Sequence, residues 1–185
     1  NKNLNLSLGE VSYFLNPVKF NIIISTENPK ILLDESKLEI KSVESVISLK
    51  SIISRKFLID NLKILNKEIN IKDVISLARI FQNSPELFIL DKVIKKGTLS
   101  ADINLNFDSE SKIKSNYIIK GFVKKGNLGI IKKYEFKDLD FEFNITQNKY
   151  LFSKIESDFN NIKLTSPKIK IYKKDDLFFI NGSIL

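Results

Sequence analysis

The sequence predicts a mainly β fold of long antiparallel strands, and three observations support this prediction. Apolar and polar residues alternate over long stretches, most regularly between Thr98 and Thr146. Short polar turns separate the alternating segments, and a single region has helical spacing instead. Alternation is typical of strands with one apolar and one polar face, and short turns favour antiparallel pairing. We therefore expect a curled sheet, either groove-like or sandwich-like, with one or two short helices at about 73–96.

The first part of the chain is expected to form several strands. Their predicted ranges are 4–8, 18–24, 30–33, 37–50, 57–65 and 68–71. Pro17 stands at the start of the second strand, where a missing N–H is tolerated. The apolar frame shifts between Ile40 and Val43, which predicts a β-bulge. Residues 51–56 are expected to make a tight connection with one helical turn.

Helical spacing replaces the alternation after residue 72. Apolar residues from Val74 to Phe81 recur at helical intervals, and Asp73 is a suitable N-cap. Ser84 followed by Pro85 marks a second helix start. Lysines near position 95 suit the negative end of the helix dipole, and Gly97 is expected at the left-handed C′ position.

The rest of the chain is predicted to be β. The expected strands are 98–107, 112–124, 128–131, 134–146, 150–159, 162–165, 168–173 and 177–184, with turns that include 108–111, 125–127 and 166–167. Strands do not alternate with helices, which argues against a parallel sheet. We interpret 1–185 as a single elongated β domain: a first β block at 1–72, a helical insertion at 73–97 and a second β block at 98–185.

Composition excludes several functions. The chain has no Cys and no His, which removes disulfides, the usual zinc sites and His-based acid–base catalysis, and no cofactor is predicted. The net charge is +8, yet Arg occurs only as Arg55 and Arg79. We therefore interpret the lysines as a solvated sheet face rather than as a nucleic-acid site. No apolar run is long enough for a membrane-spanning helix. The chain lacks Met, so we expect a segment of a longer protein.

One group of acidic residues is a candidate active site. Asp138, Asp140 and Glu142 are expected on the solvent side of one strand. A hydrolase or a metal site would need further carboxylates that converge from other strands. A solvated polar face is the simpler interpretation, so we predict no catalytic residue, no metal site and no enzymatic activity.

Aromatic residues are the more informative feature. The chain contains 14 Phe and 5 Tyr, many of them in the second β block. Long one-sided strands need a second layer, and only two short helices are predicted. The sheet must either close into a sandwich or barrel, or leave its inner face open to an apolar ligand. The pattern by itself leaves both outcomes open.

Two regions resemble a known family. Segments 28–31, 37–40, 46–53 and 57–64 follow the order strand, strand, a short turn with the sequence Ser-Leu-Lys-Ser-Ile-Ile, and strand. This order resembles the amino-terminal part of AsmA-like proteins. Lys96–Leu99 and the long strands after it look similar to later repeats of AsmA, TamB and YhdP proteins.

The resemblance implies an envelope protein anchored in the inner membrane, with a periplasmic β-groove through which phospholipid passes between the inner and outer membranes. The implied partners are phospholipid or another lipid and further envelope proteins, with membrane contact through segments outside this chain. We expect the apolar side chains of the second block to line the groove. These residues are Leu99, Ile103, Leu105, Phe107, Tyr117, Ile119, Leu139, Phe141, Phe143 and Ile145. The alternative is a closed β-sandwich scaffold without a lipid role.

Overall fold

A computed structural model describes residues 4–33, 36–55, 58–81, 84–131, 134–175 and 177–185. It confirms the fold class, with 67% of residues in antiparallel strands and 14% in helices. Contacts between residues divide the chain into two compact units. Unit 1 comprises 1–67 and 101–119, and unit 2 comprises 68–100 and 120–185. The chain therefore passes from unit 1 to unit 2, back to unit 1, and then to unit 2 again.

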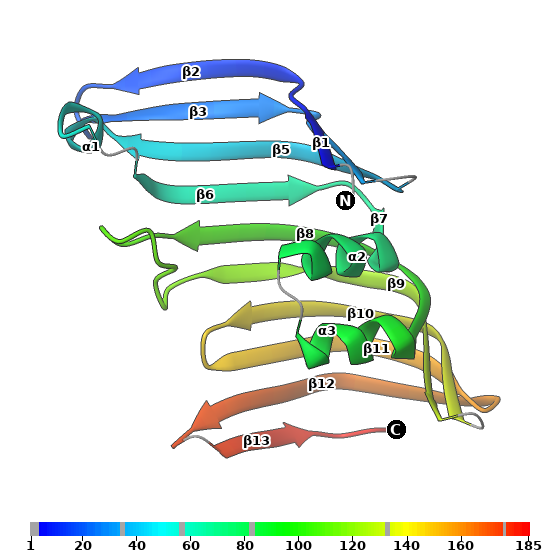
Figure 1. Cartoon of the computed structure of the whole chain (residues 1–185). Coiled ribbons are helices and arrows are strands. Elements are labelled where there is room, and N and C mark those ends of the chain that lie inside the picture. The colour runs from blue at the N-terminus through cyan, green and yellow to red at the C-terminus, as the bar shows by residue number, and fades with distance from the viewer. Residues whose placement is uncertain (1–3, 34–35, 56–57, 82–83, 132–133, 176) are drawn as a thin grey trace. The chain divides into compact units, whose positions relative to one another are not determined.

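Unit 1 is a sheet with one short helix (Figure 1). Its elements are β1 (Leu4–Ser7), β2 (Glu10–Asn16), β3 (Asn21–Glu27), β4 (Lys30–Leu33), β5 (Ser36–Ser48), α1 (Leu49–Ile53), β6 (Ile59–Asn66) and the second half of β8 (Ile94–Asn106). Strand β5 pairs with β3, β4 and β6, while β2 pairs with β3, β1 with β4 and β8 with β6. All these pairs are antiparallel, as expected.

The second predicted strand differs from the structure. The strand expected at 18–24 begins only at Asn21, because residues 17–20 form a turn. In this turn the Asn16 side-chain oxygen accepts the Lys19 N–H at 3.0 Å, and Phe20 has a φ of +50°. The turn joins β3 to β2, a strand that was not predicted.

Two local predictions in unit 1 are confirmed. The pairing of β5 with β6 shifts register between Ile40 and Ser42, where the change of apolar frame predicted a bulge. The expected helical turn forms as α1, although it begins at Leu49, inside the range predicted as strand.

Unit 2 combines a helix pair with a second set of strands. Its elements are β7 (Ile69–Asn70), α2 (Ile71–Phe81), α3 (Pro85–Val93), the first half of β8, most of β9 (Ile118–Ile131), β10 (Tyr134–Thr146), β11 (Lys149–Phe159), β12 (Ile162–Lys174) and β13 (Leu177–Gly182). The strands lie in the order β8-β9-β10-β11-β12-β13, and β7 pairs with β8. No helix among the described residues has the length and apolar composition needed to cross a membrane.

The structure corrects the predicted start of α2 and confirms the predicted start of α3. Helix α2 begins at Ile71, before the N-cap expected at Asp73, and the Asn70 side chain accepts the Lys72 N–H at 2.9 Å. The Ser84 cap of α3 is confirmed, because its hydroxyl accepts the Leu87 N–H at 3.4 Å.

The predicted end of α3 is wrong. The helix stops at Val93, and residues 94–97 already belong to β8 rather than to a helix cap. The strand pairs with β7 just after these residues, at Thr98 and Leu99, and Gly97 itself makes a close approach to β9. A Cβ on Gly97, which has a φ of +141°, would lie 3.0 Å from the Gly126 Cα.

Two predicted turns are strand interiors. Strand β9 runs through 125–127, where Lys125 has a φ of +51° and donates its N–H to Asp140 Oδ1 at 2.6 Å. Strand β12 likewise runs through Ser166 and Pro167. The strand expected from residue 112 begins only at Ile118, after a loop that includes a bridge between Phe107 and Ile113.

Candidate functional site

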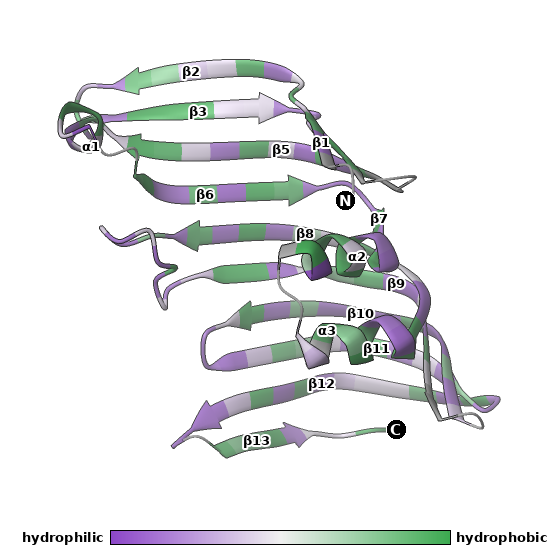
Figure 2. Cartoon of the chain, in the orientation of Figure 1, coloured by the Kyte–Doolittle hydropathy of each residue, from purple (hydrophilic) through white to green (hydrophobic). Residues whose placement is uncertain are grey.

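One side of the unit 1 sheet is lined by apolar side chains in cross-strand rows. Residues paired directly across antiparallel strands project to the same side, so the register identifies each row. The first row is Val11, Thr26, Val43, Ile64 and Ile103. The second row is Tyr13, Ile24, Ser45, Leu62 and Leu105. The third row is Leu15, Ile22 and Ile47. We call these three rows the apolar face, and Figure 2 shows the alternation of hydropathy along the strands that produces it.

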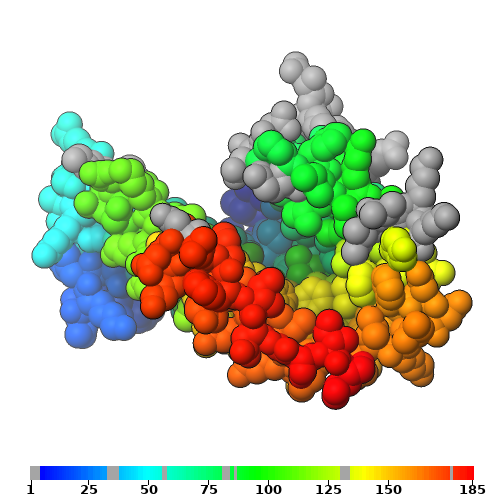
Figure 3. All heavy atoms as spheres, turned by 90° about the horizontal axis from the view of Figure 1, so that it is seen from below, coloured from blue at the N-terminus to red at the C-terminus, as the bar shows by residue number. Residues whose placement is uncertain are grey.

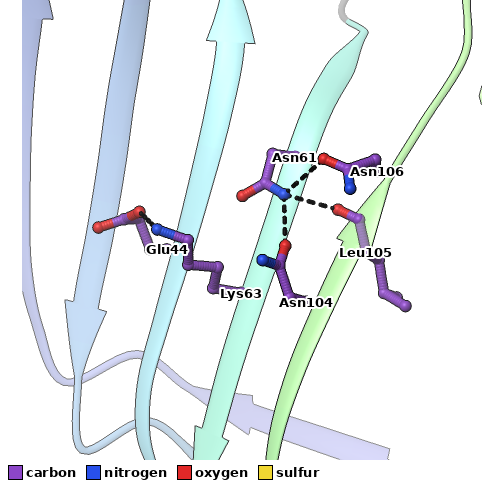
Figure 4. Close-up of polar contacts among 6 residues, drawn as sticks. All are labelled: Glu44, Asn61, Lys63, Asn104, Leu105 and Asn106. Atoms are coloured by element: carbon purple, nitrogen blue, oxygen red, sulfur yellow. Dashed lines mark hydrogen bonds and ion pairs between the residues drawn. The ribbon is translucent and has the colours of Figure 1, made fainter. Parts of the chain in front are cut away.

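The opposite side of the same sheet is more polar. Its central row is Ser12, Ser25, Glu44, Lys63 and Asn104. Lys63 and Glu44 form an ion pair at 3.0 Å (Figure 4).

An asparagine cluster joins two strands on this polar side (Figure 4). The Asn61 amide nitrogen lies 2.6 Å from Asn104 Oδ1 and 2.9 Å from Asn106 Oδ1. It also lies 3.0 Å from the Leu105 carbonyl oxygen. These contacts use charged and amide groups that water solvates well. The same side also carries Phe14, Ile23 and Val46, in the row that continues to Asn61.

The apolar face is incompletely covered. None of its members is buried, and on β2 the exposed fractions reach 83% for Tyr13 and 55% for Val11. Ile24, near the middle of the face, is 37% exposed. Among the described residues of unit 1, α1 is the only helix, and it contacts β5 and β3 at one end of the strands. An apolar face that is half-buried at its centre and exposed toward β2 is a candidate interaction site.

The predicted groove residues are divided between the two units. Of the ten, Ile103 and Leu105 belong to the apolar face, next to Ile64 and Leu62. Phe107 follows the end of β8 and lines a cleft of about 310 Å³ near α1. Tyr117 and Ile119 are half-buried residues in or beside β9, and they also belong to unit 1.

The other five predicted residues lie in unit 2. Phe143 is buried; its ring centroid lies 6.3 Å from that of Phe141, and Phe143 pairs with Phe152 on β11. Ile145 pairs with Tyr150 in the next row along the same strands. Leu99 and Leu139 are half-buried. Phe141 and Phe143 therefore belong to an aromatic cluster of unit 2.

Most of the apolar face was missed at the sequence level. The prediction placed no strand at 10–16, although Val11, Tyr13 and Leu15 alternate there with polar residues and Phe14. That alternation is the signal that could have identified β2. The pairing of β2 with β3 and β5 could not be inferred, because register depends on contacts between residues far apart in the sequence.

The acidic group on β10 takes part in local structure. Asp140 accepts the Lys125 N–H, and Glu142 forms a 2.7 Å ion pair with Lys154. Asp138 is exposed, and its backbone N–H donates to Asn127 Oδ1 at 3.2 Å. Within the described ranges, no three acidic side chains gather in a way that could hold a metal ion.

Comparisons with protein-family models, with curated proteins and with solved structures give no match to this chain.

Proposed function

We propose that the apolar face of unit 1 binds the acyl chains of phospholipid, and that the chain belongs to an envelope protein that carries lipid between the inner and outer membranes. One observation supports the binding most directly: three rows of mainly apolar side chains line one side of the sheet, and none is buried. The resemblance to AsmA-like proteins supplies the proposed periplasmic setting, with the parent protein anchored in the inner membrane.

The chemistry of the face suits an acyl chain. Burial of apolar area contributes about 25 cal/mol per Å², so a hydrocarbon tail needs no specific polar contact to be held. Ser45 and Thr26 are the polar members of the rows, and neither carries a charge. A surface of this composition accepts a flexible tail in many positions, which suits passage of lipid better than recognition of one molecule. We assign no reaction to the protein.

A closed sandwich scaffold is the competing function. It requires a second layer over the apolar face, which would bury residues such as Val11, Tyr13 and Leu15. Their exposed fractions are 55%, 83% and 52%, so lipid binding agrees better with the observed exposure.

Two substitutions on neighbouring residues of β3 test the proposal. Ile24 lies on the apolar face, and Ser25 lies on the polar side of the same strand. We expect Ile24→Asn to lower the affinity for a fluorescent fatty acid about tenfold, because a polar amide replaces an apolar contact. Ser25→Asn should bind the probe like the unchanged protein.

Native mass spectrometry after mild purification provides the second measurement. We expect phospholipid to remain bound to the unchanged chain and to the Ser25→Asn variant, and to be depleted from Ile24→Asn. Absence of lipid from the unchanged chain, or equal probe binding by the two variants, would contradict the proposal.

A further inference from the structure

The α2–α3 pair of unit 2 presents an apolar surface outward. In α3, Leu87 and Asp91 are half-buried, and Phe88, Ile89 and Leu90 are 46%, 58% and 43% exposed. Surface helices normally turn their charged residues to water and their apolar residues inward. Helix α3 departs from this arrangement in part, because three large apolar side chains are exposed together with Lys92 while the Asp91 carboxylate is half-buried. Figure 3 shows the pair (green) standing out from β12 and β13 (orange and red) of the same unit.

The inward carboxylate holds the two helices together. Asp91 forms a 2.6 Å ion pair with Arg79 of α2, and both side chains are about one-third exposed. Lys72 Nζ also lies 3.4 Å from the Asp91 carbonyl oxygen. The orientation of α3 is therefore fixed by contacts with α2, to which the Phe88 ring adds a contact with Arg79.

Cations surround the exposed apolar residues. Lys92 Nζ lies 4.6 Å from the centroid of the Phe88 ring, and Arg79 Cζ lies 5.6 Å from the same centroid. Lys95 Nζ donates to the Lys92 carbonyl oxygen at 2.9 Å. Between Asn70 and Gly97 the sequence holds five basic and three acidic residues. The two helices themselves carry three basic and three acidic residues, and Lys95 and Lys96 at the start of β8 bring the segment to a net charge of +2. Positive charge therefore gathers where α3 ends, beside its exposed apolar side chains, and this combination favours binding to anionic lipids.

We propose that α3 docks the protein on an anionic membrane surface. Ile89 enters the boundary of the acyl chains with Phe88 and Leu90 flanking it around the helix, and Lys92 and Lys95 contact the headgroup phosphates. Three side chains fall well short of the roughly 800 Å² per partner that a specific protein interface buries, whereas a lipid surface needs no matching shape. The inference deepens the proposed function and rests on it, because docking supplies the membrane from which lipid is taken or to which it is delivered.

Cosedimentation of the full chain with vesicles tests the docking. We expect binding to vesicles of equimolar phosphatidylglycerol and phosphatidylcholine, and much weaker binding to pure phosphatidylcholine. Ile89→Ser should lower the partition coefficient about tenfold, and Lys92→Gln and Lys95→Gln about fivefold each. Ile162→Ser is the matched control, because Ile162 is 61% exposed and lies on β12, away from the helix pair in the sequence. It should leave vesicle binding unchanged.

A tryptophan reporter gives an independent readout. The chain contains no Trp, so Phe88→Trp introduces a single emitter. We expect its emission to shift to shorter wavelength when anionic vesicles are added, because the indole enters an apolar environment. Failure of the unchanged chain to bind anionic vesicles, or equal losses for Ile89→Ser and Ile162→Ser, would overturn the docking.

The two proposals fail separately. If lipid stays bound to the protein but anionic vesicles do not bind it, docking through α3 is wrong and the proposed function stands. If vesicles bind through α3 but the purified chain carries no lipid and ignores the fatty-acid probe, the proposed function is wrong.

Discussion

The two units use the same alternating pattern of residues but cover their apolar side chains differently. In unit 2, Ile75 of α2, Val123 of β9 and Phe143 of β10 are buried. In unit 1, the rows of the apolar face hold no buried residue, and the buried apolar residues Leu38 and Ala101 lie outside these rows. The comparison teaches that alternation specifies an apolar side of a sheet, whereas covering elements decide whether that side becomes a core or a surface.

Matched isoleucine substitutions are expected to show the largest difference between the units. Ile75 is 5% exposed and Ile24 is 37% exposed. Ile75→Ala should lower the free energy of unfolding by about 3 kcal/mol, because it leaves a cavity. Ile24→Ala should lower it by about 1 kcal/mol, because its side chain already contacts water. Urea denaturation measures both changes, and equal values would remove the distinction between a buried side chain of unit 2 and an exposed one on the apolar face of unit 1.

Gly97→Ala tests the contact between β8 and the start of α2 in unit 2. The added Cβ would lie 3.0 Å from both the Gly126 Cα and the Ile71 Cδ1, at a φ of +141°. We expect a loss of about 2 kcal/mol from backbone strain and displaced contacts. Hydrogen exchange should show faster opening of α2, whereas the strands of unit 1 keep their protection. If hydrogen exchange in β3 and β5 accelerated to the same extent as in α2, the two units would open together.

Thr26→Val is expected to have a smaller effect with the opposite sign. The Thr26 hydroxyl oxygen is buried and has no hydrogen-bond partner among the described residues. Replacing it with a methyl group of similar size should raise the free energy of unfolding by about 1 kcal/mol. The change also makes the apolar face more hydrophobic, so binding of the fatty-acid probe should not weaken. A drop in stability would show that the hydroxyl is satisfied in solution.

The smallest expected effect concerns the loop after β8 in unit 1. Asp108 accepts the N–H groups of Lys112 and Glu110 at 3.0 and 2.8 Å, and these hydrogen bonds, with the Lys112 bond first, lower the pKa of its carboxyl below 3.8. A lowered folded-state pKa contributes stability that is present above 3.8 and lost as the pH falls through the folded value. Asp108→Asn should remove this part of the acid dependence. Denaturation curves at pH 5 and at pH 2.5, about one unit above and one unit below 3.8, provide the measurement.

Local sequence patterns predicted much of the β structure. Strand β10 was predicted with the bounds that the structure has, because apolar and polar residues alternate from Leu139 to Thr146 and polar residues flank both ends of the strand. The Ser84 cap and the bulge after Ile40 were predicted for the same kind of reason: a few neighbouring residues determine each of them. Errors arose where a distant strand supplied the deciding contact. The lysine at 125 stays inside β9 because the Asp140 carboxylate binds its N–H, and no local pattern contains that information.

The candidate site was only partly predictable. Ile103 and Leu105 were expected on an apolar surface, and they lie there, but Phe141 and Phe143 belong to the aromatic cluster of the other unit. The Ile103–Leu105 pair and the Phe141–Phe143 pair both alternate with polar residues, so the local sequence does not distinguish them.

By itself, the sequence determined the secondary-structure class, the separation of apolar from polar side chains on the strands, and the absence of Cys and His chemistry, because these depend on residue type and on spacing along the chain. Only the tertiary structure decided which strands pair, which apolar residues are buried, and that α3 turns Phe88 and Ile89 outward. Pairing, cover and helix orientation depend on contacts between residues far apart in the chain, such as the ion pair between Arg79 and Asp91. A period of two or of 3.6 residues carries no record of such contacts.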